Sequence, residues 1–253
     1  MQLIDSHAHI YLSEFDIDRE ILLEEALNVG IGKILMPAID SSTHDLMLQV
    51  EAGFENCISM MGLHPCSVKE NYKDELATVN RWFNQRQFIA VGEIGLDFYW
   101  DKTFSKEQYD VFHNQIEIAL IYDLPIVVHS RNATDDCIEV VKQYPLLKGV
   151  FHCFSGNTEQ AQNLIERGFL LGIGGVVTFK NAGLDEVIEQ IGLTNVILET
   201  DSPYLAPVPF RGKRNEPGYL RYITEKLALL SGKEPEEVAK ITTQNAINLF
   251  NLS

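Results

Sequence analysis

Apolar residues follow two alternating patterns along the chain. Short, nearly continuous runs of Ile, Leu, Val and Phe alternate with longer segments in which apolar residues recur every three or four positions. The short runs are typical of strands buried on both faces, and the longer period is typical of amphipathic helices. Their regular alternation favours parallel strands joined by helical crossovers.

Both kinds of element can be assigned to residue ranges. The helix that begins at Ser105 is expected to start with a capping box, because Gln108 lies three residues on. The predicted strands are 3–5, 33–37, 58–62, 89–93, 125–129, 149–152, 169–173 and 196–199. The predicted helices are 19–28, 43–51, 74–84, 105–120, 135–143, 158–167, 184–191, 219–230 and 235–250.

This order predicts one domain over residues 1–253. Eight βα units follow one another without a linker, so we expect an α/β fold, a (β/α)8 TIM-like barrel with an extra C-terminal helix. A doubly wound open sheet is the competing fold. No dinucleotide-type glycine motif and no Walker A motif is present, and Gly172, Gly174 and Gly175 are interpreted as glycines that let loops or a ligand approach the barrel top.

Composition narrows the classes of function. With 45% hydrophobic and 22% charged residues the chain is typical of a globular protein, and no uncharged run is long enough to span a bilayer. The start lacks a secretory pattern and the four cysteines form no Cys-x-x-Cys pair, so we expect a cytoplasmic protein. No predicted helix has an apolar surface stripe beyond what the barrel needs, so a monomer is the default. A net charge of -16 argues against a broad basic face that grips duplex nucleic acid.

Two histidines stand at the end of the first predicted strand. His7 and His9 are two residues apart, so on an extended strand their imidazoles point to the same side. Imidazole is the commonest side-chain metal ligand, and two on one face supply half a coordination shell. Alone, the pair is equally compatible with two solvated histidines near a terminus.

More polar residues follow the other predicted strands, where barrel enzymes keep their chemistry. They are His64, Glu93, His129, His152 and Asp201. Singly, each has an ordinary explanation as a satisfied core or loop residue, as does Asp97. Together they would carry a large desolvation penalty without a cation, so the sequence predicts two divalent ions with Glu93 as the bridging carboxylate. His44 and His113 fall within predicted helices and are expected on the surface.

With these residues assembled, the chain resembles the TatD family of metal-dependent hydrolases, within the amidohydrolase-like barrels. The resemblance spans nearly the whole chain. The motifs that carry it are Asp5-Ser6-His7-Ala8-His9, Gly62-Leu63-His64-Pro65, Val91-Gly92-Glu93-Ile94-Gly95-Leu96-Asp97, His129-Ser130-Arg131, His152-Cys153-Phe154-Ser155-Gly156, Glu199-Thr200-Asp201-Ser202-Pro203-Tyr204-Leu205 and the stretch 245–250.

The resemblance implies a metal-dependent nuclease, typically an exonuclease on DNA, and it places His64 beside the scissile phosphate. The family is usually described as magnesium-dependent, whereas an imidazole-rich shell suits zinc or manganese, so the metal is left open as Mg, Mn or Zn. The implied ligand sets are His7, His9, Glu93 and Asp201 for one ion, and Glu93, His129 and His152 for the other.

These residues suggest phosphodiester hydrolysis with a two-metal-activated water. Asp201 is expected to orient or deprotonate that water, beside Glu93 and His64 as catalytic residues. Arg131 is expected to bind a phosphate in bidentate fashion. Arg211 and Lys213, with the neighbouring Arg214, either bind further phosphates or form a solvated loop. The aromatic residues 98–100 either stack unpaired bases or pack their loop on the barrel.

The expected substrate is therefore a short single strand or an end of DNA. Two other functions stay open at this point. One is a metal-dependent ester or amide hydrolase, such as a deacylase of aminoacylated nucleic acid, which would use the same water and metals. The other is a metal-binding protein without catalytic activity.

Overall fold

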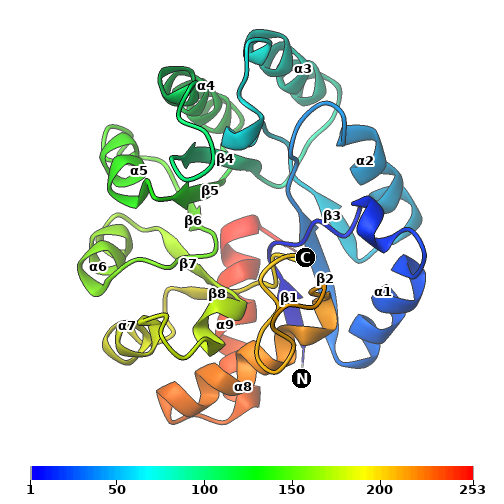
Figure 1. Ribbon diagram of the computed structural model, residues 1–253, viewed down its shortest axis with the longest axis vertical. Coiled ribbons are helices and arrows are strands. Elements are labelled where there is room, and N and C mark those ends of the chain that lie inside the picture. The colour runs from blue at the N-terminus through cyan, green and yellow to red at the C-terminus, as the bar shows by residue number, and fades with distance from the viewer. Residues whose placement is uncertain (1, 253) are drawn as a thin grey trace.

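The computed structural model describes residues 2–252 and contains a ring of parallel strands surrounded by helices (Figure 1). The strands form two parallel sheets, with the orders β1-β2-β3 and β4-β5-β6-β7-β8. Their bounds are β1 (Leu3–Asp5), β2 (Ile31–Met36), β3 (Cys57–Ser59), β4 (Val91–Asp97), β5 (Ile126–Arg131), β6 (Gly149–Phe151), β7 (Leu170–Ile173) and β8 (Val196–Leu198).

Short bridges join the two sheets into a closed ring. On one side Met61 pairs with Val91 in parallel, and on the other side Ala8 pairs with Ser202. Both sheets are thus continued around the barrel by residues just beyond their edge strands. The predicted (β/α)8 TIM-like barrel is confirmed, and the doubly wound alternative is wrong.

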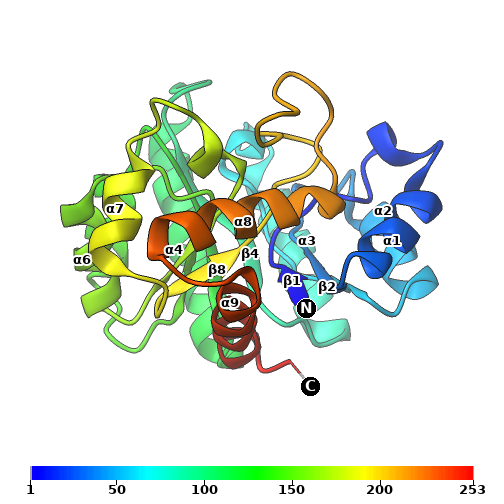
Figure 2. The ribbon, with the colours of Figure 1, turned by 90° about the horizontal axis from the view of Figure 1, so that it is seen from below.

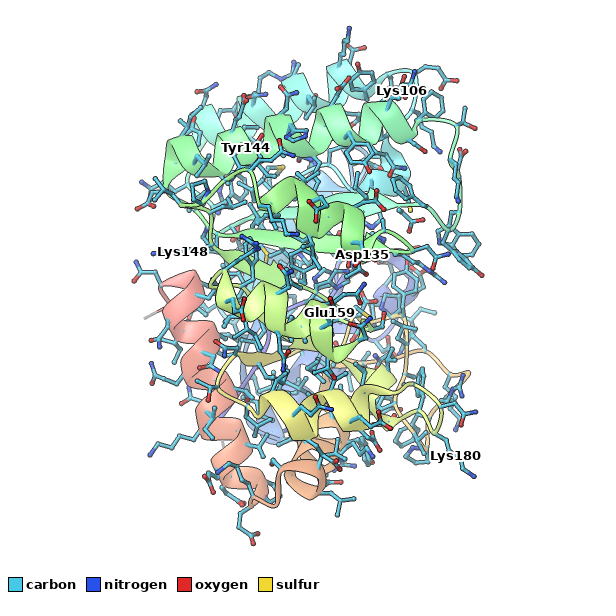
Figure 3. The ribbon with its side chains drawn as sticks, turned by 90° about the vertical axis from the view of Figure 1, so that its left-hand side faces the viewer. Lys106, Asp135, Tyr144, Lys148, Glu159 and Lys180 are labelled. Carbon is cyan, nitrogen blue, oxygen red and sulfur yellow. The ribbon has the colours of Figure 1, made fainter. Side chains whose placement is uncertain are left out.

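The helices begin at the end of the barrel where the strands end, as expected for right-handed crossovers. Figure 3 shows α4 to α7 side by side, with Lys106 and Lys180 at one end of this layer and Tyr144 and Lys148 at the other. The bounds are α1 (Arg19–Asn28), α2 (His44–Gly53), α3 (Tyr72–Gln85), α4 (Ser105–Tyr122), α5 (Thr134–Val141), α6 (Thr158–Glu166), α7 (Leu184–Ile191), α8 (Leu220–Ser231) and α9 (Pro235–Phe250).

The extra helix α9 closes one end of the barrel. In Figure 2 it lies below the strands, on the side opposite the long loop between β8 and α8. Its Ala246 and Phe250 belong to one buried cluster with apolar residues contributed by the strands. Eight residues of this cluster, on the strands or directly beside them, are here called the floor layer: Ile4, Leu35, Met60, Ala90, Val127, Val150, Leu170 and Ile197.

Two strands run further than the sequence predicted. β4 continues past Glu93 to Asp97, and β5 continues past His129 to Arg131. The register pairs Gly95 with His129 and Asp97 with Arg131. Polar residues end an apolar run without ending the strand, because the backbone ladder between two parallel strands does not depend on side-chain polarity.

Two local predictions are wrong. The α4 capping box does not form, because the side-chain amide of Gln108 is bonded to the backbone of Asp97: its Oε1 accepts the Asp97 N–H at 2.9 Å. His44 is buried rather than on the surface, whereas His113 is half-buried and shares a hydrogen bond of 2.6 Å with the Tyr144 hydroxyl. Within the described residues, no helix is both long and apolar enough to cross a membrane.

Candidate metal centre

The strand ends at the open side of the barrel, here called the mouth, carry a polar layer directly above the floor layer. His129 lies two residues after Val127, His152 two after Val150, and Glu199 two after Ile197. Residues two apart on a strand share a face, so these side chains also point into the barrel. Gly172 leaves space in the same layer, since a Cβ there would lie 2.3 Å from Glu199 Oε2. Gly175 instead admits the loop at Leu205, which confirms a close approach there.

Glu93 lies at the centre of this layer and is buried. Its Oε1 faces three imidazoles, at 2.8 Å from His129 Nδ1, 2.8 Å from His152 Nε2 and 3.2 Å from His64 Nε2. These partners come from β5 and from the segments that follow β6 and β3. One carboxylate oxygen thus gathers side chains from three parts of the barrel.

The second oxygen of Glu93 faces the opposite side of the mouth. Oε2 lies 3.2 Å from His7 Nε2 and 3.6 Å from His9 Nε2. Asp201 Oδ1 lies 3.7 and 3.8 Å from the same two nitrogens. Asp201 has a left-handed φ of 59°, uncommon outside glycine. Its backbone N–H donates to His7 O at 2.8 Å, which ties the β8 loop to the end of β1.

The electrostatics of the layer follow from burial and from this arrangement. Burial opposes the charge on Glu93, yet His152, His64 and His7 together hold the pKa of its carboxyl well below the usual range. Burial raises the pKa of Asp201 to about 6. For His7, burial lowers the imidazole pKa well below its ordinary value. A neutral imidazole beside an ionised carboxylate is the protonation state that binds a divalent cation.

A hydrogen bond fixes which nitrogen of His129 faces Glu93. His129 Nε2 shares a hydrogen bond of 2.8 Å with Asp97 Oδ2. A carboxylate only accepts, so in the neutral imidazole this nitrogen carries the proton. The lone pair is then on His129 Nδ1, the atom that faces Glu93. His152 Nδ1 lies 3.4 Å from Glu199 Oε1 without a hydrogen bond.

His9 and His64 carry their protons on different ring nitrogens. Tyr11 donates its hydroxyl proton to Pro37 O at 2.7 Å, so its oxygen accepts from His9 Nδ1 at 3.0 Å and leaves a lone pair on Nε2. In His64, Nδ1 instead accepts the Cys66 N–H at 3.0 Å. The proton of neutral His64 is therefore on Nε2, which makes this atom a donor toward Glu93.

These side chains fit divalent metal ions. Their ligand atoms form three groups, and within each group all lie within 4.8 Å of one another. Both ring nitrogens of buried His7 lack a hydrogen-bond partner, a costly state that a cation at Nε2 would relieve. The groups are His7, His9 and Asp201; His7, Glu93 and His152; and His64, Glu93 and His129.

The basic residues expected to bind phosphate differ in their exposure and in their contacts. Arg131 is exposed at the end of β5, and its guanidinium lies 4.0 Å from the Tyr99 ring centre. Arg211 and Lys213 are exposed in the β8–α8 loop, and the Arg211 guanidinium lies 4.2 Å from the Phe179 ring centre. Arg214 is committed to the fold, because its guanidinium binds both carboxylate oxygens of Asp18.

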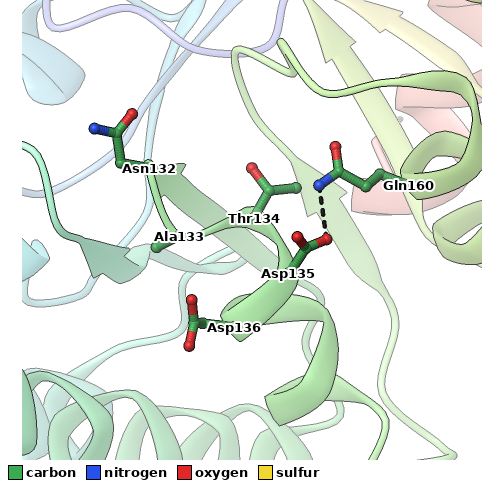
Figure 4. Close-up of a pocket in the computed structure, with 6 residues that line it drawn as sticks. All are labelled: Asn132, Ala133, Thr134, Asp135, Asp136 and Gln160. Atoms are coloured by element: carbon green, nitrogen blue, oxygen red, sulfur yellow. Dashed lines mark hydrogen bonds between the residues drawn. The ribbon is translucent and has the colours of Figure 1, made fainter.

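A shallow pocket of about 250 Å³ lies just past Arg131, at the start of α5 (Figure 4). Its lining includes Asp135 and Asp136, and Gln160 Nε2 donates to Asp135 Oδ1 at 2.7 Å. The two carboxylates make this pocket unfavourable for a phosphate. The polar layer around Glu93 is the better candidate site.

Two supporting residues were not recognised from the sequence. Glu199 is part of a family motif, but no function was expected for it from the sequence, and nothing in the sequence pointed to Tyr11. The spacing of two from Ile197 to Glu199 was a usable signal, because it repeats the spacing from Val127 to His129. Tyr11 had no comparable signal, because it supports His9 through a side chain beyond the strand.

Comparison with known proteins extends the picture over the whole chain. The model of the TatD related DNase family matches residues 4–251. The uncharacterized metal-dependent hydrolase YabD of Bacillus subtilis is 37% identical and covers 99% of this chain and 100% of its own length. The 3'-5' ssDNA/RNA exonuclease TatD of Salmonella typhimurium is 30% identical, with 99% of each chain covered.

A solved structure agrees with these similarities. The crystal structure of YjjV, a TatD homologue from Escherichia coli, superposes with a TM-score of 0.94 at 30% identity and covers 99% of this chain and 98% of its own. Sequence motifs, barrel and family match lead to the same result. The chain belongs to the TatD related DNase family and is a metal-dependent hydrolase.

Proposed function

We propose that this protein is a deoxyribonuclease that removes nucleotides from single-stranded or frayed DNA ends, using two divalent ions at the mouth. The observation that carries the proposal is Glu93, whose two oxygens face two separate sets of imidazoles. A carboxylate in this position suits a bridge between two cations. A relative 30% identical to this chain is a 3'-5' ssDNA/RNA exonuclease.

The ligand sets follow the two sides of Glu93. One ion would be held by His7, His9, Glu93 and Asp201, and the other by Glu93, His129 and His152. Bound divalent ions would lower the pKa of water and neutralise developing charge on a phosphoryl group. The mixed nitrogen and oxygen donors suit zinc or manganese better than magnesium, which prefers oxygen.

The remaining polar residues act on the substrate. His64 donates from Nε2 to a phosphate oxygen, because its Nδ1 is occupied by the Cys66 N–H. Asp201 orients the attacking water and accepts its proton, because its carboxylate lies beside the imidazoles that would hold the same ion. Arg131 binds a phosphate next to the scissile one, and Arg211 and Lys213 attract the following part of the strand.

We further propose that residues 1–253 act as one domain and as a monomer in the cytoplasm. All four cysteines are free thiols, with Cys57 and Cys137 buried and Cys66 and Cys153 partly buried, an arrangement that fits a reducing compartment. Gel filtration with light scattering tests the monomer. A second copy in solution would contradict it without affecting the catalytic proposal.

The nuclease is tested with end-labelled single-stranded DNA, RNA and blunt duplex, each with a panel of divalent ions. The expected result is stepwise shortening of the single strand that requires metal, stops with EDTA and is lost in Glu93→Gln. The label position shows which end is attacked. No cleavage of any nucleic acid, at metal occupancy verified by elemental analysis, would contradict the proposal and favour ester or amide substrates.

A further inference from the structure

The loop after β4 carries three consecutive aromatic residues, of which the first is partly buried and the other two are exposed to solvent. Phe98 is partly buried against the core, and its ring lies 6.1 Å from that of Tyr109. Tyr99 and Trp100 are 51% and 68% exposed, with ring centres 4.9 Å apart at 85°. Packing of the loop therefore uses Phe98, and it leaves two large rings in solvent.

This exposure is a feature of the mouth. Within residues 2–252, the large exposed aromatic side chains are Tyr99, Trp100, Tyr122 and Tyr204. Tyr204 also lies at the mouth, with its ring centre 6.1 Å from that of His9. Tyr122 lies at the far end of α4 and stacks on Phe83. Neighbouring aromatic rings exposed to water are unfavourable unless they serve a contact.

One carboxylate holds these rings and the candidate metal centre together. Asp97 Oδ1 accepts the backbone N–H groups of Tyr99 at 2.9 Å and Trp100 at 3.1 Å. Its other oxygen, Oδ2, lies 2.8 Å from His129 Nε2. The position of the rings is thus tied to a proposed metal ligand through a single side chain.

A cation completes the cluster. Arg131 pairs in register with Asp97, and its guanidinium lies 4.0 Å from the Tyr99 ring centre and 5.2 Å from that of Trp100. The loop is also held beyond the rings, where Lys69 Nζ bonds Asp101 Oδ2 at 2.9 Å. Positive charge beside aromatic faces is the arrangement by which proteins bind unpaired bases and their phosphates.

We propose that Trp100, packed edge-to-face with Tyr99, supported by Asp97 and accompanied by Arg131, is a platform on which an unpaired base stacks next to the phosphate at the metal centre. The ligand is a single-stranded nucleic acid, and this inference rests on the proposed nuclease activity. Stacking does not read base identity, so the platform selects unpaired ends rather than sequence. In a duplex the bases are already stacked on one another and cannot occupy it.

The direct test measures stacking without cleavage. The chain has two tryptophans, so Trp82→Phe leaves Trp100 as the single tryptophan, which can be excited apart from the tyrosines. Titration in EDTA with a short oligothymidylate is expected to quench its fluorescence in a saturable way. An oligonucleotide of equal length with abasic residues keeps the phosphates and is expected to quench at least about fivefold less.

The kinetic test uses Trp100→Ala with the same two substrates. On the natural single strand we expect KM to rise about tenfold, which corresponds to about 1.4 kcal/mol, with kcat near that of the wild type. On the abasic strand the ratio of variant to wild type is expected near one. Trp100→Phe should restore most of the affinity, and Leu146→Ala, which changes an 84% exposed residue remote from the mouth, is the matched control.

The outcomes separate this inference from the function on which it rests. Metal-dependent cleavage without quenching, and with an unchanged KM in Trp100→Ala, would overturn the platform and leave the nuclease intact. Equal quenching by the abasic strand would assign the contact to charge alone and would also overturn the platform. Absence of both cleavage and quenching would reject the nuclease itself.

Discussion

The floor layer and the polar layer around Glu93, here called the mouth layer, are built on the same strands, two residues apart. Their chemistry is nevertheless opposite. On β5, Val127 packs in the apolar cluster that includes Ala246 and Phe250 of α9, whereas His129 lies between the carboxylates of Glu93 and Asp97. On β6 and the residue after it, Val150 and His152 repeat the contrast. A single strand direction and a period of two thus serve both layers.

The difference separates stability from chemistry. Burial of apolar area in the floor layer stabilises the barrel in proportion to that area. In the mouth layer, burial works against each charged group: it raises the pKa of Asp201 to about 6 and opposes the ionisation of Glu93. Asp201 and His7, whose pKa values burial shifts toward the neutral form, are expected to cost stability in the metal-free protein and to recover it when a cation binds. Glu93 differs, because the neighbouring imidazoles keep it ionised.

The largest expected effect comes from removing the central charge of the mouth layer. Glu93→Gln keeps the shape of the side chain but removes the negative charge between five imidazoles. We expect hydrolytic activity to fall by about 10³-fold or more and metal content to drop. In EDTA the melting temperature should fall, because the imidazoles that hold the pKa of Glu93 low lose their counter-charge. Elemental analysis, a nuclease assay and calorimetry measure the three quantities.

Glu189→Gln is the matched control for this change, because Glu189 is exposed on α7. Both its activity and its melting temperature are expected to equal those of the wild type. Unchanged metal content and activity in Glu93→Gln would contradict the assignment of Glu93 to the metal centre.

A substitution in the floor layer is expected to lower stability and to leave activity almost unchanged. Phe250→Ala removes a buried ring where α9 meets the strands, so we expect a loss of about 3–5 kcal/mol in the free energy of unfolding. At a temperature where the variant is folded, kcat should stay within about twofold of the wild type. Urea denaturation and a nuclease assay test both, with exposed Leu229→Ala as control. A fall in kcat without a fall in stability would show that the layers are coupled.

The floor layer and the order of elements could be predicted from the sequence because they depend on local patterns. Apolar runs and helical periods located all eight strands and the helices, and histidines at the strand ends identified the open side of the barrel. What failed was decided by tertiary contacts. Gln108 had the spacing of a capping residue, but its amide satisfies the backbone of Asp97 instead.

The sequence indicated which residues gather at the mouth, but not which contacts hold them there. Spacing placed His129 and Glu93 at strand ends, but it did not show that Asp97 supports both His129 and the aromatic loop. For the same reason the sequence did not show that Arg214, a candidate to bind phosphate, instead binds the carboxylate of Asp18 within the fold. The burial of His44 was likewise not shown, because it depends on how α2 packs and not on the residues beside it in the chain.

His44 can be compared with the histidines of the mouth layer, because it is also buried but lies outside that layer. Burial lowers its pKa below the ordinary value, against weaker attraction from Glu75, Asp40 and Asp45. Since the unfolded chain takes up a proton near pH 6.5 and the folded protein does not, stability is complete above that pH and declines as pH falls below it.

The expected decline approaches about 1.4 kcal/mol per pH unit for one proton. Denaturation between pH 5 and pH 8 in EDTA should show a smaller pH dependence in His44→Leu than in the wild type. The carboxylates of the mouth titrate in both proteins, so the difference between them isolates His44. An identical dependence in the two proteins would show that the pKa of His44 is the same in the folded and unfolded states, and would contradict the lowering by burial.

The smallest effect distinguishes two adjacent cations in the β8–α8 loop. Lys213 is exposed and Arg214 is held by Asp18, so only Lys213 is free to meet a phosphate. In Lys213→Ala we expect the slope of log KM against log salt concentration on single-stranded DNA to fall by about 0.7, with unchanged thermal stability. Arg214→Ala should instead lower stability by about 1 kcal/mol and leave the slope unchanged. If the two variants exchanged these effects, the loop would reach the substrate through Arg214, and the Asp18 pair would open when DNA binds.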